Sequence, residues 1–225
     1  MLTVQILRRR DRIRYNQLAQ LAYGRAKGFT AETRAISWGP LDEVFYQLAV
    51  FEGEELLSYM RLEWINEAKD FTGRLKYSPS AEEVPCAYLN IAATQPHWQG
   101  KGLNGLLRFY SLKIIENWRM NYLFGSMVPG SPRIQVMKRM GYEFWQSSQP
   151  WTSGFQSAEL PLIARLDMRK HLAGALEILE KENKILISEA RLTFDPKAIK
   201  VRSQTQTSHI FNDYKKFFGN FNSQS

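Results

Sequence analysis

A run of small and polar residues in the middle of the chain is the stretch best suited to do chemistry: AATQPHWQGKGLNGLL, residues 92–107. An apolar run, Cys86–Thr94, leads into it, and helical spacing of apolar residues begins at Leu103. Backbone N–H groups at a helix N-terminus lack intrahelical partners and can bind an anion. Lys101 adds positive charge, and three glycines would let the backbone approach phosphate oxygens: Gly100, Gly102 and Gly105. The pattern predicts a pyrophosphate cradle, with a purely structural tight turn as the alternative.

Two better-known phosphate-binding loops do not fit this stretch. A Walker loop ends in Gly-Lys-Ser/Thr, and residues 92–107 contain no such ending. The three glycines match the dinucleotide pattern G-x-G-x-x-G literally, but no early βαβ unit precedes them. The acidic residue of that fingerprint, expected about 20 residues further on, is also missing, because Met120–Phe124 is non-acidic. Neither a Walker site nor a Rossmann site is therefore expected.

The loop resembles motif A of the GNAT acyltransferases, a pattern that it carries as Pro96-x-x-Gln99-Gly100-Lys101-Gly102-Leu103 followed by Leu106-Leu107. Further along, a second run resembles the end of the last core helix of that family: Met137-Lys138-Arg139-Met140-Gly141-Tyr142. Two matches in the right order are more specific than either alone. The resemblance spans residues 2–146 and implies the GNAT fold.

This resemblance also implies the donor and the reaction. The donor would be an acyl-CoA, acetyl-CoA being the first expectation, and the acceptor a small-molecule or peptide amine. The loop amides would bind the pyrophosphate, and the preceding strand would pair with the pantetheine arm. The amine would attack the thioester directly, with the oxyanion held by backbone N–H groups of that strand. The implied donor-binding residues are Ala92, Ala93, Thr94, Gln99, Gly100, Lys101, Gly102, Leu103, Asn104 and Gly105.

Catalytic residues are less clearly marked. Asn104 stands where many members of the family have Gly or Ala, and Met137 stands where many carry a tyrosine general acid. Some members have a general base in the strand that corresponds to Cys86–Thr94, which here has no acidic residue. Tyr88 and Asp42 are the candidates to move a proton or orient a water. Each has a structural alternative, since buried tyrosines usually bond to backbone and Asp42 could cap a loop.

The N-terminal half resembles one branch of this superfamily, the acyl-homoserine-lactone synthases and the long-chain N-acyl amino acid synthases. The matching residues are Arg25-x-x-x-Phe29, Trp38, Asp42, Phe45 and Arg61-Leu62. This branch takes its acyl chain from the phosphopantetheine of an acyl carrier protein, an acidic partner that would suit a basic chain. Against it, the glutamate and arginine of that branch's central strand are replaced, at about Tyr88 and Ile91. Both an acyl-CoA donor and an acyl carrier protein donor therefore remain open.

Apolar periodicity predicts the elements that hold the loop in place. Strands are expected at residues 2–7, 45–51, 56–65, 86–94, 122–128, 142–146 and 160–168. Helices are expected at residues 11–26, 103–120, 132–140, 169–183 and 209–218. Residues 28–44 and 66–85 read as irregular, and residues 184–208 as polar with no core-forming period. The order predicts an α/β (α+β) fold, with a mixed, mostly antiparallel central sheet and helices on both faces. Residues 1–150 would form the acyltransferase core and residues 151–225 a C-terminal extension.

Composition and charge limit the classes of protein to which the chain could belong. The 225 residues are 44% hydrophobic with a formal charge of +8, which favours a globular chain with anionic partners. One cysteine and three scattered histidines give no metal site. No apolar run could span a bilayer and no targeting segment is recognised, so a cytoplasmic protein is expected.

Two further function classes stay open: a GNAT-like domain that binds acyl-CoA without catalysis, and a nucleic-acid-binding module. The second would use a basic cluster that no recognised nucleic-acid motif accompanies: Arg8, Arg9, Arg10, Arg12 and Arg14. The sequence leaves the oligomeric state open, a dimer included.

Overall fold

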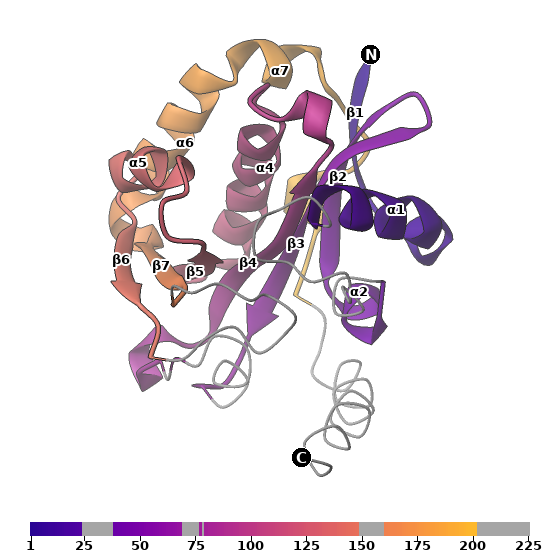
Figure 1. Ribbon diagram of the computed structural model, residues 1–225. Helices are drawn as coiled ribbons and strands as arrows, with labels where there is room; N and C mark the ends of the chain where they lie inside the picture. The colour runs from indigo at the N-terminus through magenta and orange to yellow at the C-terminus, as the bar shows by residue number, and fades with distance from the viewer. Residues whose placement is uncertain (24–37, 69–76, 78, 149–159, 202–225) are drawn as a thin grey trace, which may run out of the picture.

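A computed structural model describes residues 1–23, 38–68, 77, 79–148 and 160–201 of the chain (Figure 1). Within these residues, eight strands form one sheet in the order β6-β7-β5-β4-β3-β2-β1-β8. The strands are β1 (Leu2–Ile6), β2 (Tyr46–Glu52), β3 (Glu55–Ile65), β4 (Cys86–Thr94), β5 (Tyr122–Met127), β6 (Glu143–Gln146), β7 (Leu162–Asp167) and β8 (Arg191–Leu192). The helices are α1 (Arg12–Tyr23), α2 (Pro40–Val44), α4 (Leu103–Trp118), α5 (Arg133–Arg139), α6 (Met168–Glu182) and α7 (Lys184–Glu189).

The sheet is mixed and mostly antiparallel, which confirms the prediction. Parallel pairing joins β4 to β5 and β1 to β8, and the other neighbouring strands run antiparallel. Gly53 has a φ of +57°, the left-handed conformation that the tight turn between β2 and β3 requires. The long hairpin and β4 together form the continuous centre of the sheet.

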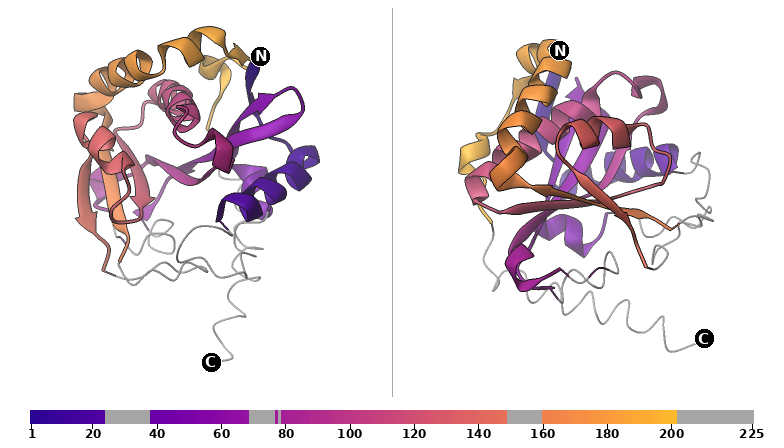
Figure 2. Two further views of the ribbon diagram at one scale, coloured as in Figure 1. Left: turned by 45° about the horizontal axis from the view of Figure 1, so that its top comes forward. Right: turned by 90° about the vertical axis from the view of Figure 1, so that its left-hand side faces the viewer.

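Helices cover both faces of this sheet, again as predicted (Figure 2). On one face α4 packs on β2, β3 and β4 and is flanked by α6. The main hydrophobic core lies here, because the apolar side of α4 meets alternate residues of the strands, such as Leu48, Leu62 and Leu89. On the other face α1 packs on β3 and β4 through Tyr15, Leu18 and neighbouring apolar residues.

Residues beyond 160 complete the sheet rather than only adding to its edge. β7 lies between β5 and β6, with Leu166 paired to Leu123 and Ile163 paired to Trp145. The helix α6 then returns over α4, and Figure 1 shows α6 and α7 arching above that helix.

Two of the predicted irregular segments contain regular structure. Residues 40–44 form α2, which begins at a proline and carries two acidic residues in its first turn, both favourable at a helix N-terminus. The prediction that residues 184–208 lack core-forming structure was wrong for their first part. α7 follows α6, and Arg191 and Leu192 of β8 pair in parallel with Thr3 and Val4. Apolar side chains of this segment pack on the main core: Leu186, Ile187, Leu192, Phe194 and Ile199.

Other expectations fall outside the described residues, among them the contacts of Arg25 and Phe29 and the terminal helix at residues 209–218. None of the described helices combines the length and the hydropathy that crossing a membrane would take.

Candidate active site

β4 and β5 diverge soon after they meet. Their parallel pairing joins residues 87–89 to residues 123–125, yet β4 continues to Thr94. The last residues of β4 therefore have a strand neighbour, β3, on one side only. A sheet edge of this kind presents backbone N–H and C=O groups that an extended ligand can pair with.

The hydrogen bonds between β3 and β4 show which backbone groups of β4 face this open edge. The N–H of Gln95 donates to the carbonyl oxygen of Leu57 at 2.9 Å, so Gln95 points toward β3. Residues of an antiparallel strand alternate between pointing toward a given neighbour and away from it. Ala93 therefore shares the direction of Gln95, while Ala92 and Thr94 turn their N–H and C=O groups to the open edge.

A β-bulge at Ile91 sets this phase. The register between β3 and β4 shifts here, and Ile91 has a φ of +37°, which is unusual for a branched residue. The extra residue brings Leu89 and Ala92 to the same face, where both contact the core under α4. Without the bulge, the edge groups of residues 92 and 94 would face β3 instead.

The N-terminus of α4 lies directly after this strand. Gly102 is the N-cap with a φ of +84°, and no side chain caps the helix. The N–H of Leu106 donates to the carbonyl of Gly102 at 3.0 Å, so the helical bonds begin only there. Among the described residues, the amides of Leu103, Asn104 and Gly105 have no backbone acceptor. These groups lie at one end of the open β4 edge, and free amides at a helix N-terminus are suited to hold an anion.

The three glycines of the loop have different surroundings. A Cβ on Gly100 would meet nothing within 4 Å, and its φ of +78° still requires glycine. A Cβ on Gly102 would lie 2.7 Å from Oδ1 of Asn183, and one on Gly105 would lie 2.6 Å from its Nδ2. These two glycines therefore let the junction of α6 and α7 pack closely on α4. Of the three positions, only Gly100 has its open space on the side of a ligand or solvent.

The loop side chains are also arranged locally. The ammonium of Lys101 lies over the ring of Trp98, 4.6 Å from its centroid. The side chain of Gln99 donates to the carbonyl oxygen of Thr94 at 3.4 Å, which ties the loop to the end of β4. The exposed residue His97 lies beside them.

Two arginines lie where α4 and α5 are close together, Arg108 on α4 and Arg133 on α5. Neither was predicted from the sequence to have a role. Nη1 of Arg108 donates to the hydroxyl of Tyr142 at 3.2 Å. Arg133 begins α5, and burial among surrounding atoms lowers the pKa of its guanidinium, with the charge of Arg108 lowering it further. The two cations are thus close enough to repel each other. Such a pair favours an anionic ligand between them.

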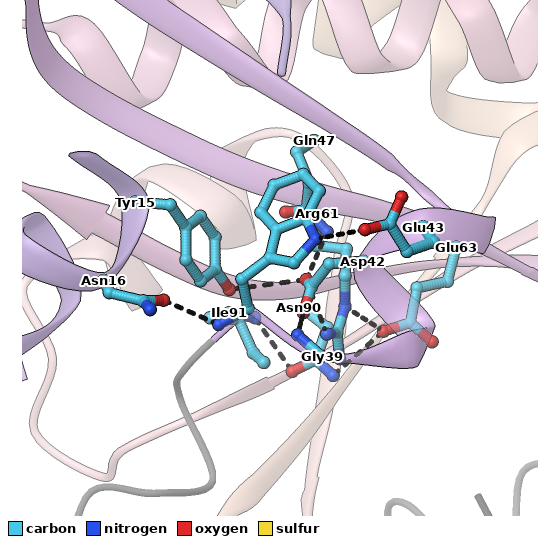
Figure 3. A network of polar contacts seen from close by, with 11 residues as sticks. Tyr15, Asn16, Gly39, Asp42, Glu43, Gln47, Arg61, Glu63, Asn90 and Ile91 are labelled. Atoms are coloured by element: carbon cyan, nitrogen blue, oxygen red, sulfur yellow. Dashed lines mark hydrogen bonds and ion pairs between the residues drawn. The ribbon is translucent and has the colours of Figure 1, made fainter. Parts of the chain in front are cut away.

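A buried polar network lies beneath the bulge, on the α1 face of the sheet (Figure 3). Nε of Arg61 donates to Glu63 at 2.7 Å, and its Nη1 donates to Asp42 at 3.1 Å. Glu63 also accepts from Nδ2 of Asn90 at 3.1 Å. Asn90 in turn accepts the N–H of Ile91 through Oδ1 at 2.8 Å. A chain of hydrogen bonds therefore runs from α2 to the bulged residue of β4.

Asp42, one of the two predicted catalytic residues, belongs to this network. Besides Arg61, its carboxylate accepts from Nε2 of Gln47 at 2.7 Å and from the N–H of Gly39 at 2.8 Å. Tyr15 donates a longer bond of 3.4 Å. Asp42 is 5% exposed, so its oxygens are occupied inside the protein rather than turned to a ligand.

The other predicted catalytic residue, Tyr88, lies where β4 and β5 still pair. Its hydroxyl is 3.2 Å from Oγ of Ser126, a residue of β5 just past the last pair. The ring is buried among Ile65, Cys86 and Phe124. Tyr88 thus stands at the closed base of the opening between the strands, and Met137 is buried in α5 with no proton to donate.

The structure brings most of the predicted donor-binding residues together, because β4 and the start of α4 are adjacent in the chain. It keeps Asp42 and Tyr88 on the opposite face from α4. Sequence reasoning missed Asn90, Glu63, Arg108 and Arg133. The one available signal was the paired charges of the Leu56–Ile65 strand, which lie on a single face.

Comparisons with solved structures identify this arrangement. A CoA-dependent acyl-homoserine lactone synthase, BjaI, with SAM and isopentyl-CoA superposes with a TM-score of 0.59 at 11% identity, covering 87% of this chain and 95% of that one. FeeM, an N-acyl amino acid synthase from uncultured soil microbes, gives 0.56 at 15%, covering 79% and 97%. A putative GNAT acetyltransferase from Desulfovibrio desulfuricans gives 0.52 at 14%, covering 74% and 99%. The chain has the GNAT fold.

By sequence, no family model and no curated protein matches the chain. The GNAT fold is thus recognised from the structure, because sequence identity to these three proteins is only 11–15%. The bulged β4, its open edge and the uncapped start of α4 are the features of this fold on which a function can be argued.

Proposed function

We propose that this GNAT-fold protein transfers an acyl group from an acyl-CoA thioester to an amine. One observation carries the proposal: the open edge of β4 leads directly to the uncapped N-terminus of α4. An acyl-CoA has the two matching parts, an extended amide-containing arm and a pyrophosphate. The arm would pair with Ala92 and Thr94, and the pyrophosphate would accept from the amides of Leu103, Asn104 and Gly105.

The same edge supports a direct reaction. The N–H of Ala92 points into the opening between β4 and β5, where it can donate to the oxygen of a thioester carbonyl. That bond strengthens as the carbonyl becomes a tetrahedral oxyanion, so it lowers the barrier to attack. The amine must arrive neutral, and a base or a water must take its proton. No covalent acyl-enzyme is required, and the buried Cys86 is not placed to form one.

Asp42 and Tyr88 remain predictions as catalytic residues, and their surroundings favour different roles. The carboxylate of Asp42 already accepts several hydrogen bonds, which favours support of the bulge over proton abstraction. Tyr88 and Ser126 line the base of the opening, where they could orient a water or limit the length of the acyl chain.

A second candidate is a long-chain N-acyltransferase that takes its acyl group from acyl carrier protein. One observation favours it: the net charge of +8, which suits an acidic carrier. The phosphopantetheine arm of a carrier would use the same β4 edge. The choice between acetyl-CoA, a longer acyl-CoA and a carrier is therefore a question of donor preference.

Thermal unfolding with a panel of donors tests the proposal. Acetyl-CoA, octanoyl-CoA, free CoA and octanoyl acyl carrier protein would each be added at increasing concentration. A donor at 100 times its Kd should stabilise the folded state by about 2.7 kcal/mol. If no thioester raises the melting temperature at millimolar concentration, the donor site is refuted.

The matched variants act at Gly100, because Gly102 and Gly105 would clash with Asn183 when substituted. Gly100→Glu and Gly100→Gln have nearly equal side-chain size and equal backbone strain, and they differ in charge. Gly100→Glu should weaken donor binding at least tenfold more than Gly100→Gln. Gly53→Glu, at another left-handed glycine with open space around it, measures the effect of the same strain and charge away from the cradle. Release of CoA thiol with amino acids and alkylamines as acceptors then measures turnover.

A further inference from the structure

The proposed reaction leaves a proton to be delivered. When the carbon–sulfur bond breaks, the CoA sulfur departs as a thiolate, and thiols are weak acids, a cysteine thiol having a pKa of about 8.5. A donor of a proton at the sulfur lowers the barrier of this step. The donor must lie on the open edge of β4, beside the N–H of Ala92 that would hold the carbonyl oxygen.

Tyr23 has its hydroxyl at this position. It is the last residue of α1, and its Oη donates to the carbonyl oxygen of Ala92 at 2.7 Å. The phase of β4 directs that carbonyl to the open edge, together with the N–H of the same residue. A thioester carbonyl bonded to this N–H would therefore bring its carbon and sulfur next to the phenol of Tyr23.

Burial and two nearby arginines change the acidity of Tyr23 in opposite directions. Burial raises the pKa of the phenol well above its ordinary value, while Arg133 and Arg61 lower it. The hydroxyl thus keeps its proton at neutral pH, and two cations lie close enough to stabilise negative charge that develops on it. Arg133 comes from α5, and Arg61 comes from β3, which pairs with β4 on the side away from the opening.

The other tyrosine hydroxyls near the opening have different settings. Tyr88 bonds Ser126 at the closed base, and Tyr142 accepts from Arg108 beside α5. The hydroxyl of Tyr23, by contrast, donates to an edge group of β4, the carbonyl oxygen of Ala92. Geometry, rather than residue type, therefore separates it from the rest.

We propose that Tyr23 is the general acid of the acyl transfer, protonating the sulfur of the leaving thiol. The inference rests on the proposed function and names a catalytic residue for it. In the step, the nitrogen–carbon bond forms and the carbon–sulfur bond breaks with its electron pair on sulfur. Oη of Tyr23 gives its proton to sulfur and regains one from the acylated nitrogen. The net change is one proton moved from nitrogen to sulfur, and no tyrosinate accumulates.

The test compares Tyr23→Phe with the wild-type protein on two leaving groups. With acetyl-CoA, or octanoyl-CoA if that is the better donor, kcat should fall about 100-fold, within the usual range for a general acid. With the S-phenyl thioester of the same acyl group, the leaving thiol is far more acidic and needs no proton. The loss of kcat should then shrink to less than about threefold. The melting-temperature shift caused by the CoA donor should be retained, since donor binding does not need the hydroxyl.

Tyr46→Phe is the matched control. Its hydroxyl also donates to a backbone carbonyl, that of Lys200, at 2.8 Å and away from the opening. This variant should keep the wild-type rate with both donors. If Tyr23 has a purely structural role, Tyr23→Phe should lower kcat by the same factor with both donors. That result would overturn the inference, and so would an unchanged kcat.

Failure of the proposed function has a different signature. If the wild-type protein shows neither a donor-induced melting shift nor thiol release, the acyltransferase proposal and this inference both fall. If it binds and turns over the donor while Tyr23→Phe is fully active, only the inference falls. Tyr23→Phe could unfold at a lower temperature than the wild type. The two donors are still compared on that same variant, so the ratio of the two kcat losses remains decisive.

Discussion

Oδ1 of Asn90 accepts the N–H of Ile91 at 2.8 Å, so a side chain satisfies the backbone group that the β-bulge takes out of the ladder. The same Asn90 donates from Nδ2 to Glu63, which is fully buried on the neighbouring strand. The bulge is thereby fixed to the network that ends at Asp42. Because the bulge decides which groups of β4 face the opening, this contact links the interior of the sheet to the chemistry at its edge.

Replacing Asn90 by alanine should therefore harm both stability and turnover. It leaves the N–H of Ile91 and one oxygen of Glu63 with fewer partners, which typically costs about 1–3 kcal/mol of unfolding free energy. The orientation of the Ala92 amide would loosen, so kcat should fall at least tenfold. Urea unfolding and thiol release measure the two effects. Asn117→Ala removes an exposed asparagine that bonds backbone carbonyls, and it should change neither.

If Asn90→Ala lowers stability but leaves kcat unchanged, the bulge does not depend on this side chain. Asn90→Asp sharpens the test. The substituted side chain retains the acceptor for Ile91 but brings a second carboxylate to Glu63. It should therefore be the less stable variant at neutral pH and recover as the solution is acidified toward pH 5.

Arg61 stabilises two buried carboxylates, those of Asp42 and Glu63, through ion pairs. Its side chain is 7% exposed, and those of its partners Asp42 and Glu63 are 3% and 0% exposed. Arg61→Met should cost about 3–5 kcal/mol, because each carboxylate is left without this cation in a poorly solvated site. Arg139→Met breaks the exposed pair with Glu182 and should cost less than about 1 kcal/mol. Equal losses in urea unfolding of the two variants would contradict the buried network.

The contact of Gly105 with Asn183 gives a test of why the loop has its glycines. A Cβ on Gly105 would overlap the amide of Asn183, since it would lie 2.6 Å from Nδ2. Gly105→Ala should lower the unfolding free energy by about 1–3 kcal/mol through overpacking. In the double variant with Asn183→Ala, the further loss should be much smaller than for Gly105→Ala alone.

A double-mutant cycle on these two positions measures the coupling directly. A coupling near zero would mean that Gly105 is not needed for close packing, and its role would return to the phosphate cradle. Donor binding is the second measurement. Gly105→Ala should leave donor affinity nearly unchanged when the double variant folds normally, unlike Gly100→Glu.

Much of the fold could be predicted from local pattern. β4 was predicted with its observed bounds because Cys86–Thr94 is a continuous apolar run, as a central strand should be. The end of α5 was also visible, since Gly141 has a φ of +90° and closes the helix as a C-cap glycine. The uncapped helix start after β4 could also be predicted, because strand, loop and helix are consecutive in the chain.

The remainder depends on contacts between distant residues. Nothing local marks Ile91 as a bulge, because its conformation depends on Asn90, β3 and the network behind them. β8 has two residues and no strand pattern of its own, and it forms because α7 delivers it to β1. Nothing local shows that Gly105 packs against Asn183, because the two residues lie far apart in the chain. The spacing of residues along the chain does not predict such contacts between distant residues.

Arg133 and Arg108 should contribute to donor affinity through their charge. They lie on the two helices beside the opening, and the like charges disfavour each other until an anion is bound. Arg133→Gln should weaken acyl-CoA binding about tenfold, and the remaining affinity should depend less on salt than that of the wild type. Titration calorimetry at 50 and 300 mM salt checks both statements. Lys113→Gln, on the same helix as Arg108 and paired with Glu116, is the charge-matched control. If it weakens binding as much as Arg133→Gln, only the overall charge matters and the arginine pair has no specific role.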